Sequence, residues 1–181
     1  MAHNLLPTLD DTRTNATFEA LMWALSRPGQ TRDMPGEGFW TLAESLLDRE
    51  CSFHAPDDAS LGTMLAATGA GHAPLAEADY VFTAIGSAER VEALSSLRIG
   101  TLAYPDDAAT LFATASFGSG QRLRLSGPGI KDTVTIEVGG VEPGFWQMRR
   151  KAIRYPLGWD LYLVDGKRLL GIPRSTTIEV L

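Results

Sequence analysis

The sequence has few of the residues from which small proteins build covalent or metal cross-links. It contains one cysteine, Cys51, so neither a disulfide nor a thiolate metal site can be built within one chain. The three histidines, His3, His54 and His72, are far apart and lack ligand spacing, which favours ordinary surface or core roles. We therefore predict no metal site and expect Cys51 to be a buried structural thiol in a short strand.

The common catalytic signatures are missing as well. The chain has no P-loop, no dinucleotide-binding glycine motif, no H-E-x-x-H, no C-x-x-C and no G-x-S-x-G. Pairs of aspartates occur at 10–11, 57–58 and 106–107, beside predicted turns or helix starts. Adjacent residues do not share a face, so helix capping is a simpler role for these pairs than acid–base catalysis. The sequence therefore contains no motif that identifies a catalytic residue.

Long apolar runs and an excess of positive charge are also absent. No stretch reaches the eighteen apolar residues of a membrane span, and Met1–Pro7 lacks the basic and apolar regions of a signal peptide. The formal net charge of -6 provides no basic excess for neutralising nucleic-acid phosphates. We expect a cytoplasmic protein that binds neither membrane nor nucleic acid. A basic cluster at Arg149–Lys151 and Arg154 is predicted to be a solvated helix face or, alternatively, a partner or phosphate surface.

The composition that remains is that of a globular protein. With 181 residues, 44% hydrophobic and 21% charged, the chain is long enough to bury a core without cross-links, and we predict a single domain over residues 1–181. Apolar periodicity predicts helices at 15–26, 40–48, 58–68, 89–96 and 143–153. Compact β-branched and aromatic runs predict strands at 51–54, 80–84, 110–115, 122–126, 133–138, 160–164, 169–172 and 177–180. The order favours an α/β fold with a mixed sheet flanked by helices.

Some of these segments carry finer expectations. In the first helix, Phe18, Leu21, Met22 and Leu25 follow helical spacing and are predicted to form the buried stripe. The segments 122–126 and 133–138 alternate between apolar and polar residues, which indicates strands with one buried and one solvent-exposed face. The aromatic residues Phe145, Trp146 and Trp159 are interpreted either as core or as a surface covered by a partner.

Two segments are candidates for binding phosphate. In Arg124–Ile130 a strand runs into a turn where Gly127 and Gly129 could let backbone N–H groups converge on an anion, with Arg124 as a further donor. A turn without any ligand explains the same residues. In the second segment Arg174 precedes three hydroxyl residues and suits a phosphate, although a buried ion pair with Asp160 or another acid explains it at least as well.

These same segments resemble a known family. The blocks Q-R-L-R-L-S-G-P-G-I (121–130), P-L-G-W-D-L (156–161) and R-L-L-G-I-P-R-S-T-T-I-E-V (168–180) are similar in order and spacing to blocks of the PhnH family. The proline–glycine stop after the first helix, Ser26–Gly29, is similar too, whereas residues 30–75 match least.

The resemblance implies several properties. A member of this family is a non-metal subunit of the carbon–phosphorus lyase core complex, with PhnG, PhnI and PhnJ as partners, and forms a homodimer when isolated. The complex makes α-D-ribose 1-methylphosphonate 5-triphosphate from ATP and methylphosphonate in phosphonate catabolism, and the subunit alone has no expected activity. The fold is implied to resemble the large domain of pyridoxal-phosphate-dependent transferases.

The lysines of the sequence indicate whether a pyridoxal cofactor can bind. A pyridoxal enzyme needs a lysine for its Schiff base, and the only lysines, Lys131, Lys151 and Lys167, lie in a turn, a basic helix and a hairpin. We therefore expect a cofactor-free, vestigial version of that fold. The alternative function is a stand-alone phosphoryl or ribosyl transferase with a phosphate site at Arg124, Gly127, Gly129 and Arg174. That alternative requires the two arginines to converge on one pocket without being paired to acids.

Overall fold

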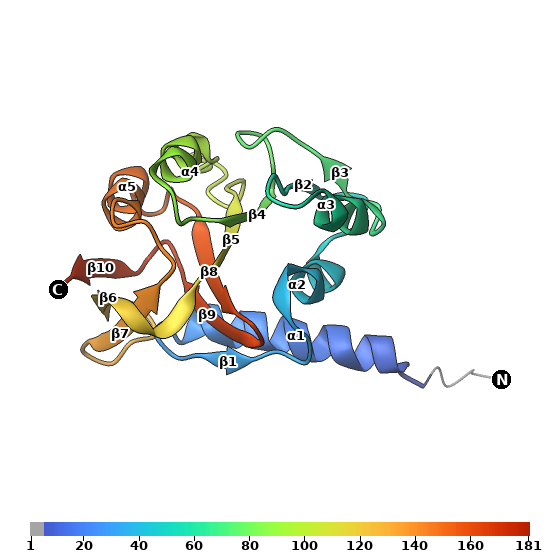
Figure 1. Cartoon of the computed structure of the whole chain (residues 1–181), viewed down its shortest axis with the longest axis horizontal. Coiled ribbons are helices and arrows are strands. Elements are labelled where there is room, and N and C mark those ends of the chain that lie inside the picture. The colour runs from blue at the N-terminus through green and yellow to red at the C-terminus, as the bar shows by residue number, and fades with distance from the viewer. Residues whose placement is uncertain (1–5) are drawn as a thin grey trace.

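A seven-stranded mixed sheet lies at the centre of the computed structural model, which describes residues 6–181 (Figure 1). His3 and the beginning of the Met1–Pro7 segment lie outside the described residues. The strand order is β1-β9-β8-β5-β4-β2-β3, in which β3, β2, β4, β5 and β8 are parallel and β9 is antiparallel to both β8 and β1. The strands are β1 (Arg32–Asp33), β2 (Ser52–His54), β3 (Gly71–His72), β4 (Tyr80–Ala84), β5 (Thr110–Thr114), β8 (Asp160–Asp165) and β9 (Arg168–Ile172).

A second, antiparallel sheet has the order β10-β6-β7. It consists of β6 (Ser116–Ser126), β7 (Val134–Gly139) and β10 (Thr177–Val180). Leu123 and Leu125 of β6 and Val138 of β7 are fully buried, while Arg122 and Arg124 point to solvent. The predicted alternation in these strands is therefore confirmed, and the buried face joins the main core.

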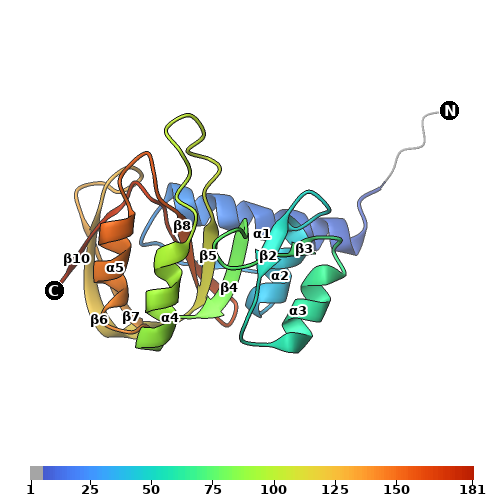
Figure 2. The same ribbon diagram turned by 90° about the horizontal axis from the view of Figure 1, so that it is seen from above.

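Helices cover both faces of the large sheet. One face carries α1 (Leu9–Ser26), α2 (Gly38–Leu46) and α3 (Ala59–Ala66), and the other carries α4 (Ala88–Ala93), the 3-10 turn at Leu94–Ser96 and α5 (Phe145–Ala152). Figure 1 shows α1 and α2 on one side of β8 and β9 and α4 and α5 on the other, and Figure 2 shows α4 and α5 side by side.

The central strands are buried on both faces, as parallel sheets require. On the α1 side a row of rings runs across the sheet, because Phe82, Phe112 and Tyr162 are register neighbours with ring centroids 4.9 and 5.0 Å apart. The Tyr162 hydroxyl donates to the backbone oxygen of Leu21 at 3.2 Å, which ties the row to α1. On the other side Val81, Leu111 and Leu161 pack with α4 and α5.

The expectation of one α/β domain with a mixed sheet flanked by helices is confirmed. Every predicted helix and strand exists, with bounds that differ by a few residues. The very short edge strands β1 and β3 and the first part of β6, which begins at Ser116, were not predicted. Cys51 lies just before β2 and is only half-buried, so the prediction of a buried strand residue is wrong in detail.

Only half of the predicted apolar stripe of the first helix faces the core, where Leu25 packs against the buried cluster. Leu21 is buried, but Phe18 and Met22 are 47% and 59% exposed. The buried positions are instead Thr17, Ala20, Leu21 and Ala24. Small residues face the sheet because α1 crosses β9 at Gly171, where a Cβ atom would lie 2.6 Å from the Ala24 backbone. The close approach of the α1 and β9 backbones therefore determines which face of α1 is buried.

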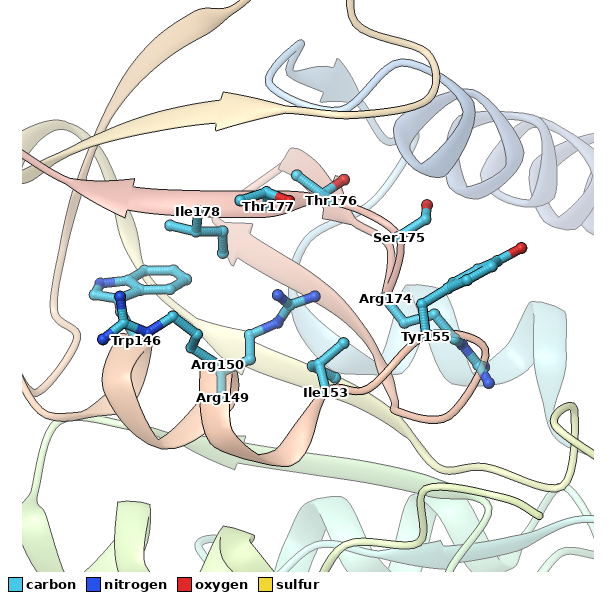
Figure 3. A pocket seen from close by; sticks show the side chains of 10 residues that line it. All are labelled: Trp146, Arg149, Arg150, Ile153, Tyr155, Arg174, Ser175, Thr176, Thr177 and Ile178. Atoms are coloured by element: carbon cyan, nitrogen blue, oxygen red, sulfur yellow. The ribbon is translucent and has the colours of Figure 1, made fainter. Parts of the chain in front are cut away.

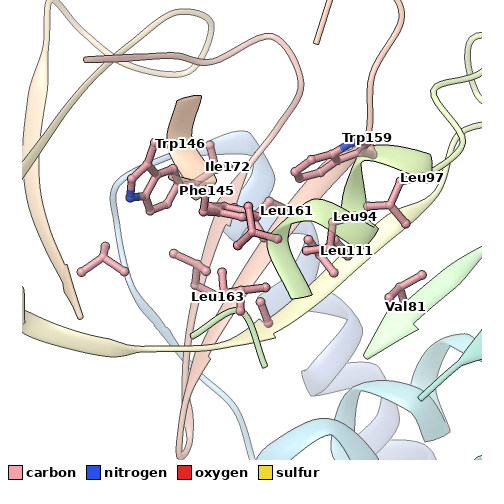
Figure 4. Packing of buried hydrophobic residues seen from close by; sticks show 14 of the residues in the cluster. Val81, Leu94, Leu97, Leu111, Phe145, Trp146, Trp159, Leu161, Leu163 and Ile172 are labelled. Atoms are coloured by element: carbon pink, nitrogen blue, oxygen red, sulfur yellow. The ribbon is translucent and has the colours of Figure 1, made fainter. Parts of the chain in front are cut away.

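The three aromatic residues left open by the sequence belong to the core. Phe145 and Trp159 are fully buried and Trp146 is 3% exposed. Figure 4 shows them packed with Leu161, Leu163 and Ile172 in the cluster beneath α4 and α5. The core interpretation is confirmed, and these rings supply no docking surface.

Candidate functional site

Arg174 is held in a network of hydrogen bonds at the start of β8. Its guanidinium donates to both carboxylate oxygens of Asp160, at 2.8 and 3.3 Å, and to the backbone oxygen of Pro105. The backbone N–H of Arg174 donates to the same carboxylate at 2.7 Å. Both side chains are about four-fifths buried. The ion-pair interpretation of Arg174 is thus confirmed, and its charge is already compensated.

Arg124 is also paired with an acid. It lies on β6 opposite Glu179 of β10, and its guanidinium donates to that carboxylate at 2.8 Å on the exposed face of the second sheet. The two arginines are therefore each neutralised by their own carboxylate. This arrangement gives no support to a transferase site built on them.

The two glycines of the candidate turn are explained by backbone geometry. Both have positive φ, and a Cβ atom at Gly127 would lie 2.9 Å from the Ser175 oxygen. A Cβ atom at Gly129 would lie 2.3 Å from the Ser26 oxygen. The turn thus packs against the end of α1 and against the segment that leads into β10, and this contact requires glycine whether or not an anion binds.

The carboxyl ends of the parallel strands, where open α/β sheets usually bind ligands, are occupied by an internal acid. Asp57 follows β2 and accepts hydrogen bonds from the Thr83 hydroxyl and the Ala84 N–H of β4, both at 2.7 Å. It also forms an ion pair with Arg90 of α4. At the end of β4, a carboxylate of the protein itself therefore uses the donors that an anionic ligand would need.

A cavity of about 220 Å³ lies at the opposite end of the sheet, between α5 and the segment that enters β10 (Figure 3). Helix α5 contributes Trp146, Arg149 and Arg150, and the facing segment contributes Ser175, Thr176 and Thr177. A wider recess of about 520 Å³, lined by Pro143, Gln147 and Glu179 among others, shares Trp146 and Arg150 with it. The two hollows form one groove along the outer edge of β10.

Arg149 is the unusual member of this groove. It is 3% exposed, donates to the backbone oxygens of Ile172 and Pro173 at 3.1 Å, and lies over the Trp159 ring at 5.4 Å. Burial lowers the pKa of Arg149 to about 10, and the charge of Asp160 only partly opposes this effect. The guanidinium thus remains a cation at neutral pH, and no carboxylate between residues 6 and 181 forms an ion pair with it.

Sequence reasoning missed this residue. It placed Arg149 in a basic cluster and predicted a solvated face, which is correct for the exposed Arg150, Lys151 and Arg154 but wrong for Arg149. The helical spacing of Phe145 and Arg149 on one face was the available signal, because these positions are one turn apart.

Two further properties follow from the described residues. Residues 6–181 contain no group of three or more histidine, cysteine, aspartate or glutamate side chains placed to hold a metal ion. Within the same range none of the helices has both the length and the apolar character needed to span a bilayer.

Comparison with known proteins gives a consistent result. The family model for the bacterial phosphonate metabolism protein PhnH matches residues 9–179. The chain is 32% identical over 173 residues to the putative C-P lyase subunit protein HtxG of Stutzerimonas stutzeri, covering 93% of this chain and 87% of that protein. It is 30% identical over 182 residues to the alpha-D-ribose 1-methylphosphonate 5-triphosphate synthase subunit PhnH of Rhizobium meliloti (strain 1021), covering 91% of this chain and 89% of that protein.

Proposed function

The chain belongs to the PhnH family of bacterial phosphonate metabolism proteins, and from this premise we propose that it is a subunit of the carbon–phosphorus lyase core complex. In this proposal it assembles in the cytoplasm with PhnG, PhnI and PhnJ. The assembly makes α-D-ribose 1-methylphosphonate 5-triphosphate from ATP and methylphosphonate, and the isolated chain is an inactive homodimer. The observation that carries the proposal is the match across residues 9–179 together with two relatives that are both named as subunits.

The surface of α1 supports a role in an assembly. Phe18, Met22 and Trp23 are 47%, 59% and 43% exposed and border a mostly apolar hollow of about 440 Å³. Arg27 and Arg32 lie over the Trp23 ring at 5.8 and 5.4 Å, so the apolar centre has a cationic rim at one end. Large exposed apolar groups with a polar rim are typical of interfaces between subunits.

We assign this α1 surface to a partner subunit of the complex. The packing of α1 on the sheet uses Ala20, Leu21 and Ala24 and leaves Phe18, Met22 and Trp23 outside, so these three side chains contribute little to the fold of the chain itself. A partner that covers them with apolar side chains and places acids near Arg27 and Arg32 fits both features. A second copy of the chain at the same surface is the competing outcome.

The proposal includes the absence of a pyridoxal cofactor from a vestigial transferase-like fold. Lys131, Lys151 and Lys167 are all exposed, whereas a Schiff-base lysine needs a desolvated amine beside groups that hold the phosphate. The residues present therefore do not fit pyridoxal phosphate. Incubation with the cofactor followed by gel filtration should leave the protein without the visible absorbance of a bound pyridine ring.

Reconstitution tests the subunit role. PhnG, PhnI and PhnJ should be co-expressed with and without this chain, and adenine release from ATP plus methylphosphonate should be measured. We expect the complete set to be active and the isolated chain to release no adenine. Full activity of the three partners without this chain, or turnover by this chain alone, would overturn the proposal.

A further inference from the structure

Strand β10 is an edge strand of the second sheet, with β6 on one side and, among residues 6–181, no strand on the other. It pairs antiparallel with β6, and the N–H of Leu181, the residue that follows β10, donates to a backbone oxygen of the β6 strand at 2.9 Å. In an antiparallel pair every second residue directs its N–H and C=O at the neighbouring strand. Ile178 and Val180 therefore direct these backbone groups outward, away from β6.

The outward edge of β10 borders a groove. Among residues 6–181 no turn, loop or second strand forms a hydrogen bond with the backbone of Ile178 or Val180. All four residues of β10 line the recess of about 520 Å³, and the cavity of about 220 Å³ continues it beside Thr177 and Ile178. The groove thus follows the free edge over the whole strand. Such an edge suits an extended polypeptide, whose backbone groups repeat at the same spacing.

The opposite wall of the groove indicates which side chains that polypeptide carries. Figure 3 shows Ile178 facing the side chains of α5 across the hollow, with Trp146 and Arg150 on that wall. Arg150 is exposed and forms no ion pair within the part of the chain that the structure describes. Glu179 also lines the groove, but its carboxylate is bound to Arg124. An acidic side chain complements the free guanidinium, and an apolar one complements Trp146 and Ile178.

A second copy of β10 fits this edge poorly. The register that joins all the outward groups of two antiparallel copies pairs Ile178 of one copy with Val180 of the other. The same register sets Glu179 directly opposite Glu179 of the second copy, and like charges directly opposite destabilise a strand pair. It also brings no acid to the α5 side, where Arg150 lies. The edge therefore fits a segment of different sequence.

We propose that an extended segment of another subunit adds a strand to the outer edge of β10, with an apolar side chain packed toward Trp146 and an acidic one paired with Arg150. This inference rests on the proposed function, because it takes the segment to come from the same complex. It deepens that function by naming a second contact, separate from the α1 surface.

Hydrogen exchange of backbone amides tests the added strand. It is measured by mass spectrometry with residue-level fragmentation, on the chain alone and on the chain assembled with PhnG, PhnI and PhnJ. We expect the N–H groups of Ile178 and Val180 to exchange at least about tenfold more slowly in the complex, because they become hydrogen-bonded there. The N–H of Leu181, which is bonded to β6 in both states, corrects for a general change in the opening of the strand.

Two substitutions at Val180 separate the backbone contact from the side chain. Val180→Pro removes the outward N–H, and an edge strand tolerates proline where its N–H faces outward. Val180→Thr keeps the N–H and the branched shape. Titration calorimetry against the PhnG–PhnI–PhnJ assembly should show binding about tenfold weaker for Val180→Pro, because an acceptor of the partner loses its donor. Val180→Thr should bind as the unmodified chain does.

Two charge reversals on α5 test the acidic side chain of the partner. Arg150→Glu and Lys151→Glu make the same change of net charge at neighbouring exposed positions. Arg150 lines the groove, whereas Lys151 lines a separate hollow together with Ser95 and Met148. We expect Arg150→Glu to weaken binding at least about tenfold, because it replaces attraction by repulsion at the contact. Lys151→Glu should have a clearly smaller effect.

Each outcome decides between the possibilities. Assembly without slower exchange at Ile178 and Val180 would overturn this inference and leave the proposed function standing, whereas failure of the chain to assemble at all would overturn both. Exchange that is already slow in the isolated homodimer would assign the edge to a second copy instead. Equal effects of Arg150→Glu and Lys151→Glu would contradict the acidic contact. If Val180→Pro fails to fold, the exchange rates and the charge reversals still decide the matter.

Discussion

Three arginines of this protein differ in what compensates their charge. Arg174 is largely buried and bound to Asp160, and Arg124 is exposed and bound to Glu179. Arg149 is buried, and no carboxylate among residues 6–181 forms an ion pair with it. The energetic consequences differ accordingly. An exposed ion pair replaces hydrogen bonds to water and therefore contributes little to the free energy of unfolding. Removing one member of a buried ion pair leaves an uncompensated charge in the interior.

We therefore predict that Arg174→Met lowers the free energy of unfolding by about 2–3 kcal/mol, because the Asp160 carboxylate loses its ion-pair partner and the Pro105 oxygen loses its hydrogen-bond donor. Arg124→Met should lower it by no more than about 1 kcal/mol. Urea unfolding monitored by circular dichroism measures both. Equal losses in the two variants would contradict the assignment of Arg174 as a structural clamp.

Asp79 links the first residue of β2 to the segment before β5. Burial acts to raise the pKa of its carboxyl, but hydrogen bonds from the Ser52 hydroxyl and N–H and from Arg98 together bring the pKa below its ordinary value of 3.8. The folded state thus binds this proton less tightly than the unfolded state does. The stabilisation is complete above the ordinary pKa and is lost as the pH falls through the lower folded value.

Acid unfolding should reveal this effect. Between about pH 5 and about pH 2 the free energy of unfolding should fall less steeply in Asp79→Asn than in the unmodified protein, since the variant has no such carboxylate to protonate. A slope unchanged by Asp79→Asn, measured by urea titration at each pH, would contradict the prediction.

At the scale of elements, the contact between α1 and β9 determines how the first helix lies. Ala24 of α1 lies so close to Gly171 of β9 that a Cβ atom at Gly171 would clash with backbone atoms. Backbone atoms cannot relieve a clash by changing rotamer, as a side chain can. The close approach also positions the Leu21 carbonyl for the Tyr162 hydroxyl. The orientation of α1, and with it the exposed apolar surface, depends on this crossing.

Gly171→Ala should therefore destabilise the protein by about 2 kcal/mol or more, as overpacking of a core against backbone does. Gly62→Ala is the matched control, because Gly62 lies in α3 with nothing within 4 Å of the added Cβ. That substitution should stabilise by up to about 1 kcal/mol through helix propensity. Thermal unfolding of the two variants compares them, and a harmless Gly171→Ala would show that α1 can move away from the sheet.

At the scale of the whole molecule, the α1 surface and the α5–β10 groove lie on different sides of the fold. The α1 surface lies on one face of the large sheet, whereas the α5–β10 groove lies with the second sheet beyond the other face (Figures 1 and 3). The two can be altered independently. This separation lets a partner cover α1 without closing the groove.

Met22→Glu should abolish co-purification with PhnG, PhnI and PhnJ, since a charge at the centre of the α1 surface cannot be desolvated without a partner. Its thermal stability should match that of the unmodified chain because the side chain is 59% exposed. Met64→Glu, at a 42% exposed position on α3, should leave assembly unaffected. If Met22→Glu co-purifies normally but sediments as a monomer, the surface belongs to a second copy of the chain.

The sequence by itself determined what depends on neighbours along the chain. Alternation in 122–126 and the β-branched runs predicted the strands. The aspartate pair at 57–58 predicted helix capping, which the structure confirms for Asp58 but not for Asp57. The family blocks were recognisable for the same reason, because each is a short run with its own spacing.

Only the tertiary structure decided which groups meet across the fold. Phe18 and Met22 have the spacing of a core stripe, yet Gly171 lets the alanines of α1 approach the sheet and leaves these larger residues outside. The sequence does not distinguish Arg149, Arg174 and Arg124. In the fold, Asp160 neutralises Arg174 and Glu179 neutralises Arg124, whereas Arg149 is buried and forms no ion pair with a carboxylate of the described residues. Such differences arise from packing between distant segments, and no local pattern encodes them.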